Sequence, residues 1–138
     1  MAGSVFPIIN CRDLAPVRQF YEQVFEGEVV YSFPPEGDPV YQTLRVGDGR
    51  VALGLGNGPA MYGEVPLPAT GHAVDLCLYV PDLDAAVATA KPAGGAVVTP
   101  PADMPWGERV AYLCDPQGTM LLVIQEPEQA VESVGSIE

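Results

Sequence analysis

The sequence predicts an α+β fold built from two similar halves, each of which runs strand, helix and then three strands. The main observation is an internal repeat. Residues 9–14 (INCRDL) resemble residues 78–83 (LYVPDL), and residues 46–53 resemble residues 113–122. Both pairs are 69 positions apart, the second after a two-residue insertion in its turn, and 69 is half of the 138 residues. A displacement shared by two independent segments indicates a duplicated module.

In the first half, hydrophobic periodicity and turn residues place the elements. Residues 5–11 alternate as a strand does, and Asp13 is the expected N-cap of a helix that continues to about Phe25. One face of that helix is apolar: Val17, Phe20, Tyr21 and Val24. We expect Gly27 to end the helix, and strands to follow over residues 28–33, 40–46 and 50–55.

The second half repeats this order. We expect a strand over residues 72–80, a short helix capped by Asp82 and ended by Gly94-Gly95, and strands over residues 96–99, 109–114 and 119–125. The chain is therefore expected to be a single domain, with module one at about residues 4–56 and module two at about residues 72–126. Residues 57–71 are rich in Gly and Pro and form the expected linker, and residues 127–138 form a frayed acidic tail.

Composition limits the functions open to the chain. With 48% apolar and 17% charged residues it can bury a substantial core, and no apolar run is long enough to span a bilayer. The formal net charge of −12, with only six basic residues, excludes nucleic-acid binding and disfavours anionic membranes. A negative field attracts cationic ligands, although net charge also serves solubility.

The cysteines and the N-terminus predict a cellular compartment. Cys11, Cys77 and Cys114 lie in apolar strand contexts and lack the spacing of a metal site. Free thiols are typical of a reducing environment. Because no basic segment followed by an apolar run opens the sequence, a cytoplasmic protein is expected.

Three motifs accompany this order of elements. They are residues 5–14 (VFPIINCRDL) followed by Phe20-Tyr21, residues 105–109 (PWGER) and residues 115–118 (DPQG). Together they resemble the vicinal oxygen chelate superfamily of glyoxalases, dioxygenases and bleomycin-resistance proteins, and the bleomycin-resistance type most of all. The resemblance covers residues 5–126 and implies tandem βαβββ modules whose mixed sheet curves into a cup. It also implies a homodimer that exchanges its N-terminal strand, and Pro7 suits an edge or exchanged strand because proline lacks a ladder donor.

Metal-dependent members of that superfamily hold an ion with ligands from four strands. The resemblance maps these four positions to Phe6, Leu53, Asp75 and Leu122. Three of them are hydrocarbon side chains, whereas a catalytic metal normally needs about three protein ligands. A slip of one residue would bring in Pro7, Ala52 or Leu121, which are no better. We therefore expect no metal, no other cofactor and no catalytic residue.

A ligand site is expected on the cup side of the sheet. Strand alternation directs Phe6, Ile8 and Asn10 there from the first strand, and Asp75, Cys77 and Tyr79 from its counterpart. The other expected wall residues are Leu53, Leu55, Met120, Leu122 and Ile124, whereas Ile9, Cys11, Leu76, Leu78, Val80, Leu121 and Val123 are expected to face the helices. Any of the cup-side residues could instead be ordinary core packing.

The resemblance adds side chains from outside these strands. Phe33 and Tyr41 stand where it places aromatic walls, with Tyr62 of the linker as a further candidate. Trp106, in a loop expected at residues 100–107, offers a stacking face. Glu108, like Asp75, could meet a cationic group, although Glu108 could equally be a solvated residue at a strand end.

These expectations favour a metal-free protein that sequesters a natural-product antibiotic in apolar clefts of a homodimer. Bleomycin-like cationic molecules and flat aromatic polyketide or enediyne compounds both suit such a lining. Two enzymatic alternatives stay open. One is a glyoxalase- or dioxygenase-like lyase or oxidoreductase with an atypical metal site, and the other is a metal-free catalyst that uses Asp75 as a general base.

Overall fold

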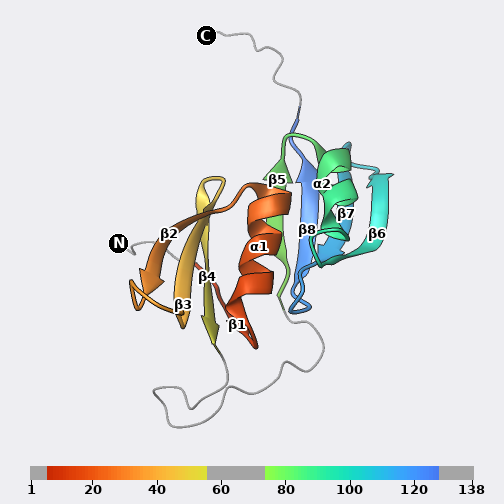
Figure 1. Cartoon of the computed structure of the whole chain (residues 1–138). Coiled ribbons are helices and arrows are strands. Elements are labelled where there is room, and N and C mark those ends of the chain that lie inside the picture. The colour runs from red at the N-terminus through yellow and green to blue at the C-terminus, as the bar shows by residue number, and fades with distance from the viewer. Residues whose placement is uncertain (1–5, 56–73, 128–138) are drawn as a thin grey trace, which may run out of the picture.

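The computed structural model describes residues 6–55 and 74–127, which form two four-stranded mixed sheets and two helices (Figure 1). The elements of the first half are β1 (Ile8–Cys11), α1 (Leu14–Phe25), β2 (Glu28–Phe33), β3 (Tyr41–Val46) and β4 (Gly49–Leu55). Those of the second half are β5 (Leu76–Val80), α2 (Leu83–Ala90), β6 (Ala96–Asp103), β7 (Arg109–Cys114) and β8 (Met120–Gln125). Tyr62, the site candidate in the expected linker, lies outside the described residues.

The two sheets have the same topology. Their strand orders are β1-β4-β3-β2 and β5-β8-β7-β6. In each sheet the first strand of the half runs parallel to the last, and the other neighbours are antiparallel. The prediction of tandem βαβββ modules is therefore confirmed. β1 lies at a sheet edge, as Pro7 indicated, whereas exchange of this strand with a second copy stays a prediction.

Helix α1 forms because six apolar side chains repeat at helical spacing and are all buried: Leu14, Val17, Phe20, Tyr21, Val24 and Phe25. Its N-cap is Asp13, as predicted, although the aspartate side chain makes no capping hydrogen bond. The helix ends at Phe25, as predicted, but Gly27 is not the left-handed residue that terminates it. Glu26 adopts the left-handed conformation instead, with a φ of 56°. Gly27 allows a close approach of the chain, because a Cβ there would lie 3.1 Å from the Tyr21 carbonyl oxygen.

Helix α2 is shorter and is capped as expected. The carboxylate of Asp82 accepts a 3.1 Å hydrogen bond from the N–H of Ala85. Leu83, Ala86 and Ala90 are its buried residues. Within residues 6–55 and 74–127, neither helix has the length and apolar character that a bilayer crossing demands.

A single core joins the two halves. Helix-facing side chains of both sheets, including Leu53 and Leu121, belong to one buried cluster with the helices. Phe20 of α1 reaches the second half, where a Cβ on Gly95 would lie 2.4 Å from its ring. The helix-facing residues expected from alternation are all in this cluster or packed against it, so that prediction is correct.

Strand β6 is longer than predicted. It continues to Asp103, so Pro100 and Pro101 belong to a strand rather than to a loop. Proline is tolerated there because β6 is an edge strand and needs no ladder donor on its outer side. Consequently the connection that carries Trp106 is a short turn, closed by a 2.7 Å hydrogen bond from the N–H of Met104 to the Glu108 carbonyl.

Candidate functional site

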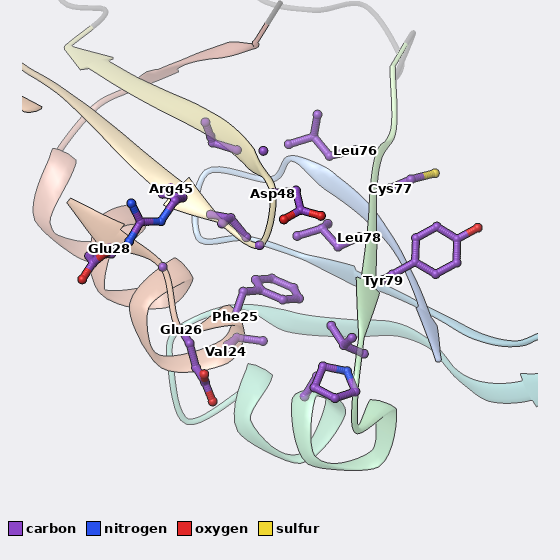
Figure 2. Close-up of a pocket in the computed structure, with 18 of the residues that line it drawn as sticks. Val24, Phe25, Glu26, Glu28, Arg45, Asp48, Leu76, Cys77, Leu78 and Tyr79 are labelled. Carbon is purple, nitrogen blue, oxygen red and sulfur yellow. Dashed lines mark hydrogen bonds and ion pairs between the residues drawn. The ribbon is translucent and has the colours of Figure 1, made fainter. Parts of the chain in front are cut away.

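Each sheet buries one face against the helices and leaves the other face open, and we call this second side the helix-free face. In β5, Leu76 and Leu78 pack against the core, whereas Cys77 and Tyr79 are exposed. Figure 2 shows Cys77 and Tyr79 projecting from β5 on the side opposite to Leu76 and Leu78. This alternation brings most of the predicted ligand-binding residues onto the helix-free faces.

On the first sheet the helix-free face is aromatic. Tyr31 and Tyr41 are in edge-to-face contact with ring centroids 6.1 Å apart, and Phe33 pairs with Tyr41 across β2 and β3. Ile8 joins them, because its Cγ2 and the Tyr41 ring both approach the open side of Gly54. Ile8, Tyr31 and Phe33 are 55%, 53% and 54% exposed. These four residues form a wide apolar surface, which we call the aromatic patch.

On the second sheet the helix-free face carries a polar pair. The hydroxyl of Tyr112 on β7 donates a 3.2 Å hydrogen bond to Oδ2 of Asp75, which lies just before β5. This hydrogen bond, with smaller effects of burial and charge, raises the pKa of Tyr112. Leu122 of β8 pairs with both Tyr112 and Cys77, so it lies between the two strands. Tyr79 is 57% exposed.

Trp106 stands at the end of the β6–β7 hairpin. It is 69% exposed, so it is not a core residue. Its indole N–H donates a 2.9 Å hydrogen bond to Glu108, which fixes the ring without burying it. The same turn borders a cavity of about 350 Å³ that also touches Tyr79 and Gln125. A fixed, exposed indole is well suited to stacking on a planar molecule.

A larger hollow than the cavity beside the Trp106 turn lies elsewhere in the described part of the chain. A groove of about 1100 Å³ runs between the end of α1, the β3–β4 turn, β5 and α2. Figure 2 shows it with Phe25, Leu78 and Asp48 around the hollow. Among the predicted site residues that the structure describes, Cys77 and Tyr79 border this groove. The groove therefore adjoins the helix-free face of the second sheet along β5.

Leu53 is the predicted site residue that lies on the opposite face of its strand from the one expected. It pairs with Ile9 and is completely buried in the core, so its expected place on the cup side is wrong. The cup-side residue of β4 is Ala52, which pairs with Ile8. Leu55, also expected on the cup side, packs against the core cluster for the same reason.

Two residues of the helix-free faces escaped the sequence analysis. Tyr31 sits two positions from Phe33 on β2, and strand alternation could have found it. Tyr112 is 37 residues from its partner Asp75, and no local pattern links the two. Phe6 and Asn10 are exposed and share the alternation of Ile8, so they lie where they were expected.

The residues at the four metal positions do not fit an ion. With Ala52 in place of Leu53, the set is Phe6, Ala52, Asp75 and Leu122, which contains one donor side chain. Nowhere in residues 6–55 and 74–127 do three His, Cys, Asp or Glu side chains gather closely enough to hold a metal. Catalytic metals normally take about three protein ligands, so no step of a mechanism can be assigned to a metal at this position.

Comparison with known proteins places this arrangement in a family. The model of the Glyoxalase/Bleomycin resistance protein/Dioxygenase superfamily matches residues 4–123. The chain is 37% identical over 89 residues to "Putative glyoxylase CFP32" of Mycobacterium tuberculosis, which is 64% of this chain but only 31% of that protein. The chain thus spans about a third of the length of that curated relative.

Solved structures show the same fold. TioX from Micromonospora sp. ML1 superposes with a TM-score of 0.72 at 20% identity, covering 91% of this chain and 100% of that one. A superfamily member from Sphaerobacter thermophilus DSM 20745 superposes with a TM-score of 0.68 at 25% identity, covering 91% and 98%. From the matched residues 4–123 and the shared topology, the chain belongs to the Glyoxalase/Bleomycin resistance protein/Dioxygenase superfamily.

Proposed function

We propose that this protein binds and sequesters a large, planar aromatic natural product, and that the helix-free faces are its binding surfaces. The observation that carries the proposal is the exposure of Tyr31, Phe33, Tyr79 and Trp106, each more than half accessible to solvent. Contiguous exposed apolar surface commonly marks an interaction site, and aromatic walls with few polar groups suit a large flat ligand. The protein acts as a binder rather than a metal enzyme because the four ligand positions offer one donor.

The proposed assembly is a homodimer in which a face of one copy closes over a face of another. A single sheet offers an open surface, whereas a ligand site normally encloses most of its ligand. Self-complementary pairing of two copies would cover the aromatic patch and create two equivalent clefts. The edge position of β1, next to Pro7, suits strand exchange between the copies.

Isothermal titration with two probes tests the binding function. Daunorubicin represents planar aromatic polyketides, and bleomycin represents larger cationic molecules. We expect one of them to bind with a dissociation constant of about 10 μM or tighter, that is about 7 kcal/mol or more. Replacement of Tyr31 and Phe33 by serine should weaken this binding at least tenfold. The proposal would be contradicted if neither probe binds, or if the double replacement leaves the dissociation constant unchanged.

An enzymatic alternative draws on one observation, the 37% identity to a protein named as a glyoxylase. It requires a metal site completed by residues other than the four mapped positions. Elemental analysis of tag-free protein decides between the two functions. About one Fe, Mn, Ni or Zn per chain would favour the enzyme, and trace metal would favour the binder.

A further inference from the structure

We propose that the groove beside β5 binds an extended, basic peptide segment of another protein, which adds to the free edge of β5 as a further strand. This site goes beyond the proposed ligand binding on the helix-free faces and does not rest on it. Three observations carry it: the way the groove meets β5, the unprotected sequence of that strand, and the charges around the groove.

The groove meets β5 along its edge. Seven consecutive residues, 76–82, line the groove. Successive side chains of a strand point to opposite faces, so a groove against one face would touch only every second residue. Figure 2 shows Leu78 and Tyr79 on opposite sides of β5, although both border the groove. The backbone edge of β5 therefore faces the groove.

That edge has no strand partner in the described part of the chain. Among those residues β5 pairs with β8 alone, at the end of the strand order β5-β8-β7-β6. The unpaired N–H and C=O groups of such an edge are a template for an added strand. An extended peptide lying in the groove can therefore form main-chain hydrogen bonds with β5, as in other cases of strand addition.

β5 also lacks the features that protect the other edge strands of the two sheets. Pro7 stands directly before β1, and Pro100 and Pro101 lie within β6. β2 has a register irregularity between Val29 and Tyr31. The sequence of β5, LCLYV, contains neither proline nor charge, and its pairing with β8 is regular throughout. Because proteins protect edges that stay free, an unprotected edge indicates a strand that receives a partner.

The free charge around the groove is negative. Five carboxylates and two guanidinium groups line it: Glu26, Glu28, Asp48, Asp82, Glu126, Arg45 and Arg50. Glu28 and Arg45 form an ion pair, and the carboxylate of Asp82 caps α2. Within the described residues, the other three carboxylates have no ion pair or side-chain hydrogen bond, and Arg50 is the one arginine left to offset them. A basic segment is complementary to this balance.

Between these charges the groove is apolar. Val24, Phe25 and Leu78 contribute to its surface. The side chains of an added strand alternate, so one set lies on this apolar surface and the other set points away from it, where the carboxylates can reach it. The segment that fits therefore alternates apolar residues with Lys or Arg.

The same charges disfavour segments of this chain as the occupant. Residues 127–138 contain three glutamates and no basic residue. Pairing of β5 with β5 of a second copy would bring two acidic grooves together, and each chain has a net charge of −12. Juxtaposed like charges are unfavourable, whereas a basic segment of another protein is attracted.

Fluorescence anisotropy with three labelled peptides tests the site. The first is acetyl-Lys-Val-Lys-Val-Lys-Val-Lys-amide, and the second has glutamate in place of lysine. The third keeps the charge of the first but carries N-methyl groups on the central valine and the lysine after it. Adjacent N–H groups of a strand point to opposite edges, so one methyl group always obstructs β5. We expect the first peptide to bind at least about tenfold more tightly than the others at about 0.15 M salt.

Two variants of α2 locate the peptide. Ala85 is exposed and lines the groove, so Ala85→Trp should obstruct it and weaken binding of the first peptide at least about tenfold. Ala88→Trp is the matched control, because Ala88 is exposed on the same helix but does not line the groove. This control should leave the affinity close to that of the wild type.

Two double variants test the charges. Glu26→Gln with Glu126→Gln should weaken binding of the first peptide several-fold, because both carboxylates line the groove. Glu36→Gln with Asp38→Asn removes an equal charge from exposed residues outside the groove and should have a much smaller effect. Hydrogen exchange gives an independent measurement: the bound peptide should slow amide exchange within residues 76–80.

Several results would overturn the proposal. Binding that the N-methyl groups do not weaken would be general charge attraction, and binding unaffected by Ala85→Trp would lie outside the groove. A wild-type dimer that Ala85→Trp dissociates, with no binding of the basic peptide, would assign the groove to a second copy. None of these results bears on the aromatic ligand, whose binding is tested by the replacement of Tyr31 and Phe33.

Discussion

The hydroxyl of Tyr21 on α1 donates a 2.8 Å hydrogen bond to the carboxylate of Asp115 in the β7–β8 turn. Both side chains are buried, and Asp115 also accepts hydrogen bonds from the N–H groups of Gln117 and Thr119. A helix of the first half is thereby bonded to a turn of the second half. Together with the shared hydrophobic core, this bond contributes to how the two halves pack and so to where their open faces lie.

Tyr21→Phe should lower the free energy of unfolding by about 1–2 kcal/mol, since it removes one donor from a buried carboxylate that keeps its two backbone donors. Chemical denaturation measures the loss. Tyr31→Phe is the matched control, because the Tyr31 side chain is exposed and should change stability by less than about 0.5 kcal/mol. Equal effects of the two replacements would show that the Tyr21–Asp115 bond contributes nothing.

Stability should fall with rising pH above about 9. Burial, together with the nearby Asp115 charge, raises the pKa of the Cys11 thiol from 9.0 to about 12, and burial also raises the pKa of Tyr21. The folded chain therefore keeps protons that the unfolded chain has released. Stability from these groups is complete below pH 9 and is lost as the pH rises toward 12, by up to about 1.4 kcal/mol per pH unit and group.

Melting temperatures between pH 8 and 11 measure this dependence, and Cys11→Ala serves as the control. Without the thiol, the decline should begin nearer pH 10, where free tyrosine titrates. A wild-type melting temperature that is constant across this range would contradict the burial of both groups.

Gly95→Ala should destabilise the fold. A Cβ at this position would lie 2.4 Å from both the Phe20 ring and the Cys114 carbonyl oxygen, so α1 and β7 would have to move apart. Overpacking of this kind typically costs about 1–3 kcal/mol. Gly49→Ala is the matched control, because its nearest neighbour would be 3.7 Å away. A wild-type melting temperature for Gly95→Ala would mean that the two halves pack less closely than the structure has them.

Dimerisation should depend on the aromatic patch. Tyr31→Asp places a charge in the middle of a surface that we propose to be covered by a second copy, and burying an unpaired charge is strongly unfavourable. Sedimentation velocity at micromolar concentration should give a dimer for the wild type and a monomer for this variant. Val98→Asp, on the exposed part of edge strand β6, is the control. A wild-type monomer would remove the shared cleft from the proposal.

The sequence predicted elements better than it predicted faces. Helix α1 and strand β2 follow from local periodicity and were placed with the bounds that the structure gives. Leu53 was misplaced because its face was counted from the turn at residues 47–49, and an error of one residue reverses a strand's faces. The pairing of Ile8 with Ala52, which a single sequence does not reveal, sets the true register.

The site depended even more on non-local geometry. Asp75 was singled out by resemblance, but its partner Tyr112 lies on a strand two places away in the sheet. The stacking role of Trp106 was predicted from its position in a loop. The sequence could not show how exposed its side chain is. The two prolines of β6 predicted a loop, because proline is excluded from the inner strands of a sheet. They are tolerated in β6 because this strand lies at a sheet edge, and the sequence does not show that position.

Trp106→Ala should weaken ligand binding and leave stability nearly unchanged. The indole is 69% exposed and donates a hydrogen bond to Glu108, so its removal opens no buried cavity. Loss of an aromatic anchor typically costs about 1–3 kcal/mol of binding free energy. Titration with daunorubicin should show this loss, and the melting temperature should move by less than about 2 °C, in line with an effect near 0.5 kcal/mol.

Glu108→Gln separates the stacking role of the Trp106 indole from any role of the Glu108 charge. The glutamine oxygen can still accept the hydrogen bond of the indole, so ring orientation and stacking should persist. Daunorubicin affinity should then stay within about twofold of the wild type, because stacking on the indole contributes more to binding than the Glu108 charge does. An indole whose fluorescence does not change on binding, together with unchanged affinity in Trp106→Ala, would place the ligand away from this hairpin.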